Sequence, residues 1–161
     1  MANRLTTRQV WDEIGQELFA VLGMVTARGE ARTVGVVYVV DGRKLYIGSD
    51  RDAWKVRHVG ANPHVSVTIP IAKRIAFLPW IKIPAATITF SGTARVLSPE
   101  EASPALLQKL FRGMAEDETR LTDSCLIEVT PEKDFVTYGI GVSLLQMRDP
   151  NLAQGRVSVG D

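Results

Sequence analysis

The segment Lys44–Ile71, KLYIGSDRDAWKVRHVGANPHVSVTIPI, is the most informative part of the chain. A short apolar strand, Lys44–Ser49, runs into a polar turn, and a brief helix carrying Lys55 follows it. After Asn62-Pro63, the β-branched run His64–Ile71 predicts a further strand. A strand that delivers a serine and a lysine to the start of a helix predicts an anion-binding site, because free backbone N–H groups and the helix dipole favour a phosphate there.

The same two residues also have an ordinary structural explanation. A lysine in a short surface helix is usually a solvated charge, and Ser49 could cap the helix rather than bind a ligand. The residue types alone leave both interpretations open.

The regions around this segment predict a mainly β protein. Thr6 and Gln9 fit a capping box at the start of a first helix, and Asp41-Gly42 is a strong hairpin signal because glycine supplies the positive φ of a tight turn. Strands do not alternate with long helices, which argues against a doubly wound parallel sheet. We therefore expect a six- to seven-stranded antiparallel barrel with three short flanking helices.

The expected elements follow from apolar periodicity and turn residues. The helices are expected from Thr6 to about Ala20, from about Asp52 to Val59, and from Ser98 onward. The strands are expected at Val21–Ala27, Arg32–Val40, Lys44–Ser49, His64–Ile71, Thr87–Leu97, Cys125–Thr130 and Phe135–Gly139, with a turn at Pro131–Asp134. We expect a single domain over residues 1–161, with the barrel at about 20–140 and a less regular tail at 141–161.

Composition excludes several classes of function. Nineteen basic and eighteen acidic side chains give a formal net charge of +1, so nothing indicates a nucleic-acid-binding face. The lone Cys125 excludes an internal disulfide, and its apolar surroundings predict a buried side chain. The N-terminus lacks the apolar region of a signal peptide, and no segment reaches the roughly 18 apolar residues of a membrane span. We expect a cytoplasmic protein.

Other motifs give no support for common enzyme classes. Gly139-Ile140-Gly141 lacks the third glycine and the following helix of a dinucleotide fingerprint, so a turn or bulge is expected there. No Walker sequence and no Gly-x-Ser-x-Gly elbow is present. His58 and His64 lack neighbouring ligands at metal-site spacing, so no metal site is predicted and a surface or interface role is expected.

An apolar loop at residues 75–83 is unusual for a simple surface loop. Phe77-Leu78-Pro79-Trp80-Ile81 lies between the basic residues Lys73, Arg74 and Lys82. It could rim a pocket, pack in a dimer interface or touch a membrane surface, and the prolines and the short length favour the first two.

Several residues between about 15 and 100 occur in the order found in a known family. Arg32 lies near the start of the second strand, Gly48-Ser49 ends the third strand, and Lys55 precedes Asn62-Pro63 by seven positions. In these features the chain resembles the FMN-binding split-barrel family, whose best-known member is pyridoxamine 5′-phosphate oxidase. The resemblance implies that these positions hold the phosphate of a flavin-type cofactor.

The resemblance also implies where the flavin ring would lie. Val34 and Ile47 are candidates for contact along the ring, and Thr87 falls where relatives direct a polar side chain at the ring edge. Trp54 beside Lys55 offers a stacking surface, although packing in the core explains it equally well.

Departures from the family pattern narrow the expected activity. Pyridoxamine phosphate oxidases carry a further lysine where this chain has Val37, and Ser-Arg where it has Ala53-Trp54. Their Trp- and Arg-rich C-terminal substrate motif is absent as well. The looser pattern resembles relatives that use a deazaflavin coenzyme, other flavin reductases and haem-binding members, rather than a true pyridoxamine phosphate oxidase.

The resemblance therefore implies a homodimeric oxidoreductase that binds FMN, or alternatively the deazaflavin coenzyme F-420, at the subunit interface. The cofactor would transfer a hydride to or from an unidentified small molecule. No side chain stands out as a catalytic acid or base. The alternative is a non-catalytic split-barrel protein that binds a cofactor, haem or a lipid-like ligand.

Overall fold

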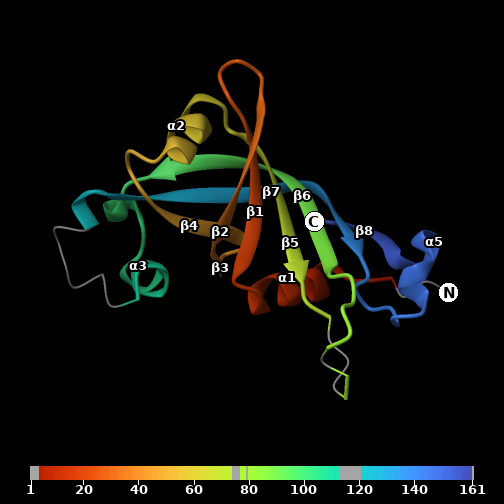
Figure 1. The fold of residues 1–161 in the computed structure, drawn as a ribbon. Coiled ribbons are helices and arrows are strands. Elements are labelled where there is room, and N and C mark those ends of the chain that lie inside the picture. The colour runs from red at the N-terminus through yellow and green to blue at the C-terminus, as the bar shows by residue number, and fades with distance from the viewer. Residues whose placement is uncertain (1–3, 74–76, 79, 113–120, 161) are drawn as a thin grey trace.

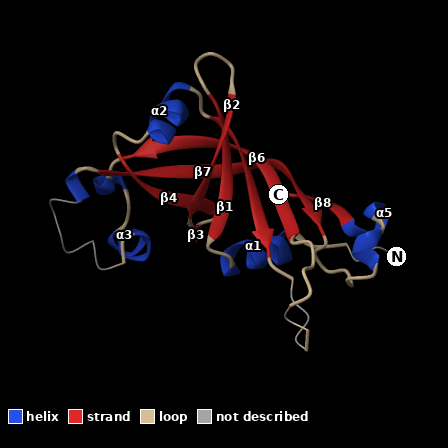
Figure 2. Cartoon of the chain, viewed as in Figure 1, coloured by secondary structure: helices blue, strands red, loops and turns tan. Residues whose placement is uncertain are grey.

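The computed structural model describes residues 4–73, 77–78, 80–112 and 121–160. An eight-stranded antiparallel sheet dominates it, and helices lie around the margin of the sheet (Figures 1 and 2). The strands are β1 Phe19–Val25, β2 Ala31–Val37, β3 Val39–Asp41, β4 Lys44–Asp50, β5 His64–Ile71, β6 Ala86–Leu97, β7 Ser124–Tyr138 and β8 Gln154–Ser158. The helices are α1 Thr7–Gln16, α2 Trp54–Ala61, α3 Pro104–Leu110 and α5 Pro150–Ala153, with short 3-10 turns at Pro99–Glu101 and Gln146–Arg148.

The sheet curls into a barrel that stays open on one side. Its strand order is β2-β1-β5-β6-β7-β4-β3, so β2 and β3 lie at opposite ends of the order although they are consecutive in the chain. The sheet must curl to bring them together, and β2 then approaches β4 without pairing with it. The expected mainly β, antiparallel split barrel is confirmed.

The interior of the barrel is filled by alternate residues of the strands, as the period of two requires. Leu22, Ile69, Ile88 and Ile127 are fully buried there. Helix α1 contributes Val10, Trp11 and Ile14 to the same core, and helix α2 contributes Val56 and Val59. The two helices therefore bury their apolar faces against the barrel core.

The predicted capping box begins α1. The Gln9 N–H donates to Thr6 Oγ1 at 3.2 Å, and the Thr6 N–H donates to Gln9 Oε1 at 2.8 Å. The helix ends at Gln16, before the expected Ala20, because the chain turns into β1 at Phe19. Burial alternates from Phe19 onward, so Phe19 and the apolar residues that follow it belong to a strand rather than to the helical stripe.

A second layer of packing covers the outer face of the sheet. Leu106 and Phe111 of the α3 region form a cluster with Leu97 of β6 and Leu126 of β7. Helix α3 begins at Pro104 with Ser103 as its N-cap, and the expected Ser98 capping box instead closes a separate 3-10 turn. The first residues of β7 are thus buried on both faces, which explains the unbroken apolar run around Cys125.

Three strand predictions need correction. The single strand predicted at Arg32–Val40 is two strands, β2 and β3, which are separated at Tyr38 and lie at opposite ends of the strand order. The predicted turn at Pro131–Asp134 does not interrupt β7, which runs from Ser124 to Tyr138, because a bulge absorbs the extra residues: Lys133 has φ 62° and the β6–β7 register shifts between Thr89 and Ser91. The tail expected to be irregular contains β8, which pairs with β7. A five-residue edge strand next to a long strand gives only a weak pattern in sequence.

The turn predicted at Gly139-Ile140-Gly141 is confirmed, because Gly139 and Gly141 have φ of 74° and 70°. None of the described helices has the length and apolar composition needed to cross a bilayer.

Candidate functional site

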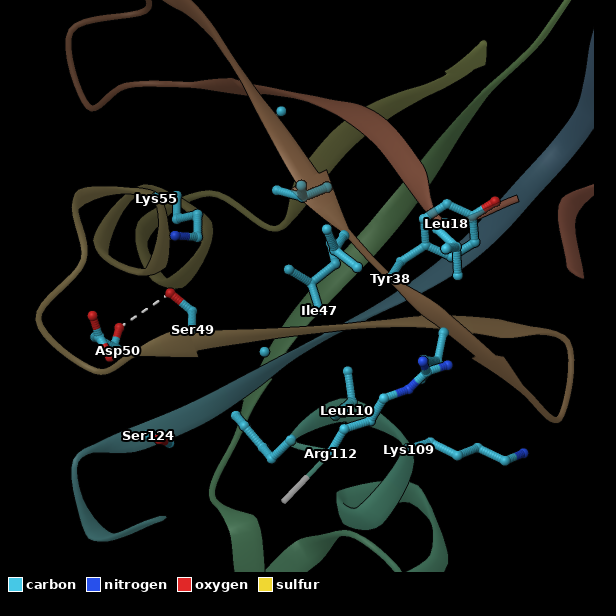
Figure 3. A pocket seen from close by; sticks show the side chains of 16 residues that line it. Leu18, Tyr38, Ile47, Ser49, Asp50, Lys55, Lys109, Leu110, Arg112 and Ser124 are labelled. Carbon is cyan, nitrogen blue, oxygen red and sulfur yellow. Dashed lines mark hydrogen bonds between the residues drawn. The ribbon is translucent and has the colours of Figure 1, made fainter. Parts of the chain in front are cut away.

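A cleft of about 670 Å³ lies at the opening of the barrel, where β2 approaches β4. Its walls are the chain from Gly35 to Val39, the end of β4 from Ile47 to Asp50, Lys55 of α2, and residues 109–112 at the end of α3. Figure 3 shows these side chains around the open space. The volume is within the range of small-molecule binding sites.

One wall of the cleft is an open strand edge. β4 pairs with β7 through residues 45–50 but with β3 only through residues 44–46. Because hydrogen bonding alternates along an antiparallel ladder, the backbone groups of Gly48 and the N–H of Asp50 point away from β7. In the described part of the chain no strand covers them, so this edge offers backbone donors and an acceptor to a ligand.

Ser49 and Lys55 meet at the end of this edge. The Ser49 hydroxyl donates to the carbonyl oxygen of Asp50 at 3.2 Å, and the Lys55 amino group lies on the Ser49 side of α2 (Figure 3). Among the described residues, Lys55 has no ion-pair or hydrogen-bond partner for its ammonium group. A half-buried ammonium group beside a hydroxyl is a chemically suitable place for a phosphate.

Ser49 does not cap helix α2 in the structure. Ala53 is the N-cap of α2, and no side chain caps the helix there. The first N–H groups of α2 therefore lack the side-chain acceptor that helices usually have. The free N–H groups at the N-terminus of a helix favour anions, and Lys55 lies in the first turn of α2.

Gly48 has a packing role on the outer face of β4. A Cβ at this position would lie 3.0 Å from Cε1 of Phe111. Glycine therefore lets the Phe111 ring sit against β4, and this contact holds the end of α3 next to the cleft.

The floor of the cleft is apolar and buried. Ile47 is only 3% exposed and belongs mainly to the barrel core. The Tyr38 hydroxyl donates to the carbonyl oxygen of Ile14 at 2.7 Å, and burial raises the pKa of Tyr38 well above its ordinary value. Tyr38 is thus a neutral structural residue that ties the cleft wall to α1.

The other predicted cofactor residues do not line the cleft of a single chain. Arg32 forms a 2.7 Å ion pair with Glu30, and Val34 packs against the core. The Trp54 ring contacts His58 with centroids 5.6 Å apart. Thr87 lies on β6 between Pro70 and Tyr138. The structure therefore brings together Ile47, Gly48, Ser49 and Lys55 and places these four residues elsewhere.

Sequence reasoning missed the wall supplied by α3. Lys109 and Arg112 both line the cleft, although more than fifty residues separate them from Lys55. No local pattern links the two segments. The only available signal was two basic residues three positions apart at the end of a short helix.

An ionic cluster around the buried Glu128 carboxylate supports β4 from the outer face of the sheet. Glu128 accepts hydrogen bonds from Tyr46 at 3.0 Å, Lys44 at 3.3 Å and Arg95 at 3.1 Å. Burial raises the pKa of Glu128, but these hydrogen bonds and the nearby positive charges outweigh it, so the pKa lies below its usual value. Burial and the hydrogen bond to Glu128 raise the pKa of Tyr46 to about 12.

Cys125, next to Ser49 in the β4–β7 ladder, is 3% exposed, as predicted, and burial raises the pKa of its thiol.

The described side chains of the apolar loop at residues 75–83 lie in solvent. Phe77 is 88% exposed and Trp80 is 73% exposed, with Leu78 and Ile81 exposed beside them. Ile75, Ala76 and Pro79 of the predicted loop lie outside the described residues.

A comparison with family models agrees with the fold. A family model described as pyridoxamine 5′-phosphate oxidase matches residues 6–137, which is most of the chain. The chain belongs to this family. No curated protein matches it at a significant level.

Solved structures with the same fold carry different descriptions. A putative pyridoxamine 5′-phosphate oxidase from Listeria innocua has 19% identity and a TM-score of 0.57, covering 79% of this chain and 94% of the other. An F-420 reductase has 18% identity and a TM-score of 0.53, covering 74% and 90%. HutZ, a haem storage protein from Vibrio cholerae, has 19% identity and a TM-score of 0.63, covering 85% and 98%. At these identities the likeness shows the fold alone.

Proposed function

We propose that this protein is an oxidoreductase that binds FMN, or alternatively the deazaflavin coenzyme F-420, in the cleft between β2 and β4. One observation carries the proposal: three features converge at one end of the cleft. They are Ser49, the start of α2 without a side-chain cap, and the Lys55 ammonium group, which has no partner among the described residues. A phosphate is the ligand group that matches a hydroxyl, free N–H donors and a cation together.

The chain's own residues would position the cofactor. Lys55 supplies a charge, Ser49 supplies a hydroxyl, and the open edge of β4 supplies backbone groups. Leu18 and Val37 are exposed apolar side chains in the cleft lining, which suits them to contact a flat ring. When bound, the flavin or deazaflavin would supply the hydride chemistry.

The residues that depart from the family pattern affect how a phosphate would be held. Val37 is 66% exposed in the cleft lining, so an apolar side chain stands where the resemblance implies a lysine. Ala53 precedes α2 without any side-chain donor. The phosphate end of this cleft therefore carries fewer cations than the pyridoxamine phosphate oxidase pattern. For this reason we propose a flavin-type site that acts on a different substrate.

The proposal includes a homodimer with the cofactor at its interface. Leu18, Phe19 and Val37 are exposed apolar residues, and Leu18 and Val37 lie in the cleft lining itself. The outer edge of β2 pairs with no described strand. A second copy of the chain would cover this apolar surface and complete the walls of the cleft.

The alternative of haem binding lacks support from the donor set. Haem iron in proteins is commonly held by His, Cys, Met or Tyr. The described residues of the cleft lining include no His, Cys or Met, and the hydroxyl of their one tyrosine, Tyr38, is bonded to Ile14.

Native mass spectrometry of the protein as purified tests the proposal, since it reports the oligomeric state and any bound cofactor together. We expect a dimer carrying one flavin-type cofactor per chain, or a dimer that takes up FMN or F-420 in a titration followed by the visible spectrum. A parallel titration with haem, followed by its Soret band, serves as the control. Failure of both FMN and F-420 to bind would refute the proposal.

A further inference from the structure

A second pocket, of about 350 Å³, lies at the end of the sheet away from the cleft. It is lined by parts of β7, α5 and β8, by the turn that follows β7, and by Arg4 and Leu5 before α1. Figure 1 shows α5 and β8 at one end of the sheet and α2 and α3 at the other. Because the two lining sets share no described residue, this pocket can bind a small molecule independently of the cleft.

Hydrogen bonds hold the walls of this pocket together. The Thr7 hydroxyl donates to the carbonyl oxygen of Ser158 at 2.9 Å, which fixes the start of α1 beside the end of β8. The Gly139 N–H donates to the carbonyl oxygen of Ala153 at 2.9 Å, which fixes the turn after β7 against α5. The pocket therefore has its shape before any ligand arrives, as most small-molecule sites do.

Thr137 is the buried polar residue of the pocket. It lies two positions after Phe135 on the inner face of β7, and it is only 1% exposed. Its hydroxyl has no hydrogen-bond partner among the described residues. Every fully enclosed side-chain polar atom of those residues does have a partner, so the Thr137 hydroxyl must open into the pocket that it lines. Folding alone favours an apolar side chain of the same shape here, because an unpartnered buried hydroxyl costs free energy.

Gly155 leaves the Thr137 hydroxyl uncovered. The two residues are opposite each other in the β7–β8 ladder, and a Cβ at position 155 would lie 2.6 Å from Thr137 Oγ1. Any other residue at this position would press on the hydroxyl. The pair therefore presents a hydrogen-bonding group at the surface of the pocket instead of closing it off.

The rest of the interior is apolar and uncharged. Its apolar lining residues are Leu5, Ile140, Val142, Leu152, Ala153 and Val157. The charged side chains of the described lining, Arg4 and Arg156, are exposed, and Arg156 is paired with Asp134 at 3.2 Å. Solvent screens both charges, so they contribute little to binding inside the pocket. An apolar wall with a single open hydroxyl selects a neutral ligand.

We propose that this pocket binds a small neutral molecule with an aliphatic body and one hydroxyl or carbonyl group, which forms a hydrogen bond with Thr137. The proposal goes beyond the proposed function, because the cofactor is assigned to the cleft. Water satisfies this hydroxyl less well, since an ordered buried water needs several polar partners and the surrounding wall is apolar. Displacement of water from that wall favours an aliphatic ligand.

A titration with cyclohexanol, followed by ¹H–¹⁵N NMR, tests the pocket directly. The backbone amides of Ile140 and Gly155 report on the pocket, and those of Ser49 and Lys55 report on the cleft. We expect saturable shifts at the first pair and none at the second. A parallel titration with cyclohexanone, which has the same carbon ring but only accepts hydrogen bonds, identifies the preferred polar group as the one with the lower Kd.

Thr137→Val keeps the shape of the side chain and removes the hydroxyl. It should raise the Kd for cyclohexanol about fivefold, whereas the binding of xenon, which has no polar group, should change by less than about twofold. Thr137→Ser keeps the hydroxyl and should bind cyclohexanol more tightly than Thr137→Val does. The matched control is Thr33→Val, at an exposed position of β2 outside both lining sets, which should leave every Kd unchanged.

Thermal melts separate a ligand-binding role of Thr137 from a structural one. Because the hydroxyl has no partner in the described residues, Thr137→Val should melt at the same temperature as the unmodified protein or higher. A lower melting temperature would mean that the hydroxyl serves the fold, and it would overturn the proposal. Shifts that do not saturate at Ile140 and Gly155, or a Kd for cyclohexanol that is the same in Thr137→Val, would overturn it as well.

Discussion

Replacement of Lys55 by glutamine removes the Lys55 cation from the proposed phosphate end of the cleft while keeping most of the side-chain volume. The Lys55 ammonium group has no competing partner among the described residues, so its full interaction is available to a ligand. A hydrogen bond to a charged group contributes about 1.5–3 kcal/mol. Because Lys55 is half-buried, solvent screens part of this interaction, and we expect about 1.5–2 kcal/mol.

That free energy corresponds to a rise of about 10- to 30-fold in the Kd for FMN. The assay is quenching of flavin fluorescence on titration with protein. Riboflavin carries the same ring without the phosphate, so its Kd should change by less than about twofold in Lys55→Gln, as expected for a distant screened charge. Arg57→Gln, on the exposed side of the same helix, should leave both ligands unaffected.

Two results would refute the reasoning about Lys55. Equal weakening of FMN and riboflavin would mean that the substitution alters the cleft rather than a phosphate contact. An unchanged Kd for FMN in Lys55→Gln, with the fold intact by circular dichroism, would mean that the phosphate lies elsewhere.

Three further substitutions test the framework around the cleft. Gly48→Val places a side chain against the ring of Phe111, and thermal melts should show a loss of about 1–3 kcal/mol. Glu128→Gln should remove stability at neutral pH. Because the native pKa of Glu128 is lowered, the difference from the unmodified protein should begin to shrink as the pH falls through the usual carboxyl pKa and should be lost below the lowered native pKa; urea melts from about pH 7 to pH 3 follow this decline. Tyr38→Phe loses the hydrogen bond to Ile14 and should cost about 1–2 kcal/mol by urea unfolding.

Much of the barrel could be predicted because its signals are local. The capping residues of α1 and the alternation along each strand specify their elements without reference to the rest of the chain. The hairpin at Gly42 and Arg43 needs positive φ at both positions, and the structure has 54° and 59° there. Ser49 and Lys55 are also close in the sequence, since Lys55 follows Ser49 by only six positions.

The rest of the site depends on how distant segments pack. Arg32 and Val37 lie on the same strand, but Arg32 pairs with Met24 near the hairpin end, whereas the cleft is lined by Gly35–Val37. Three residues of strand place Arg32 roughly 10 Å from Gly35. Sequence order could not distinguish the two ends of β2.

The α3 wall was missed for a related reason. Phe111 reaches Gly48 only after the sheet has curled and α3 has packed on its outer face. The bulge in β7 is likewise set by pairing with β6, because the shift in register appears only when the two strands are aligned.

A crystal structure of the protein soaked with FMN would most directly test the proposed cofactor site. We predict that the FMN phosphate lies within hydrogen-bonding distance of both Lys55 Nζ and Ser49 Oγ, at the start of α2. A phosphate bound at any other place on the chain, with this end of the cleft left to solvent, would contradict the proposal.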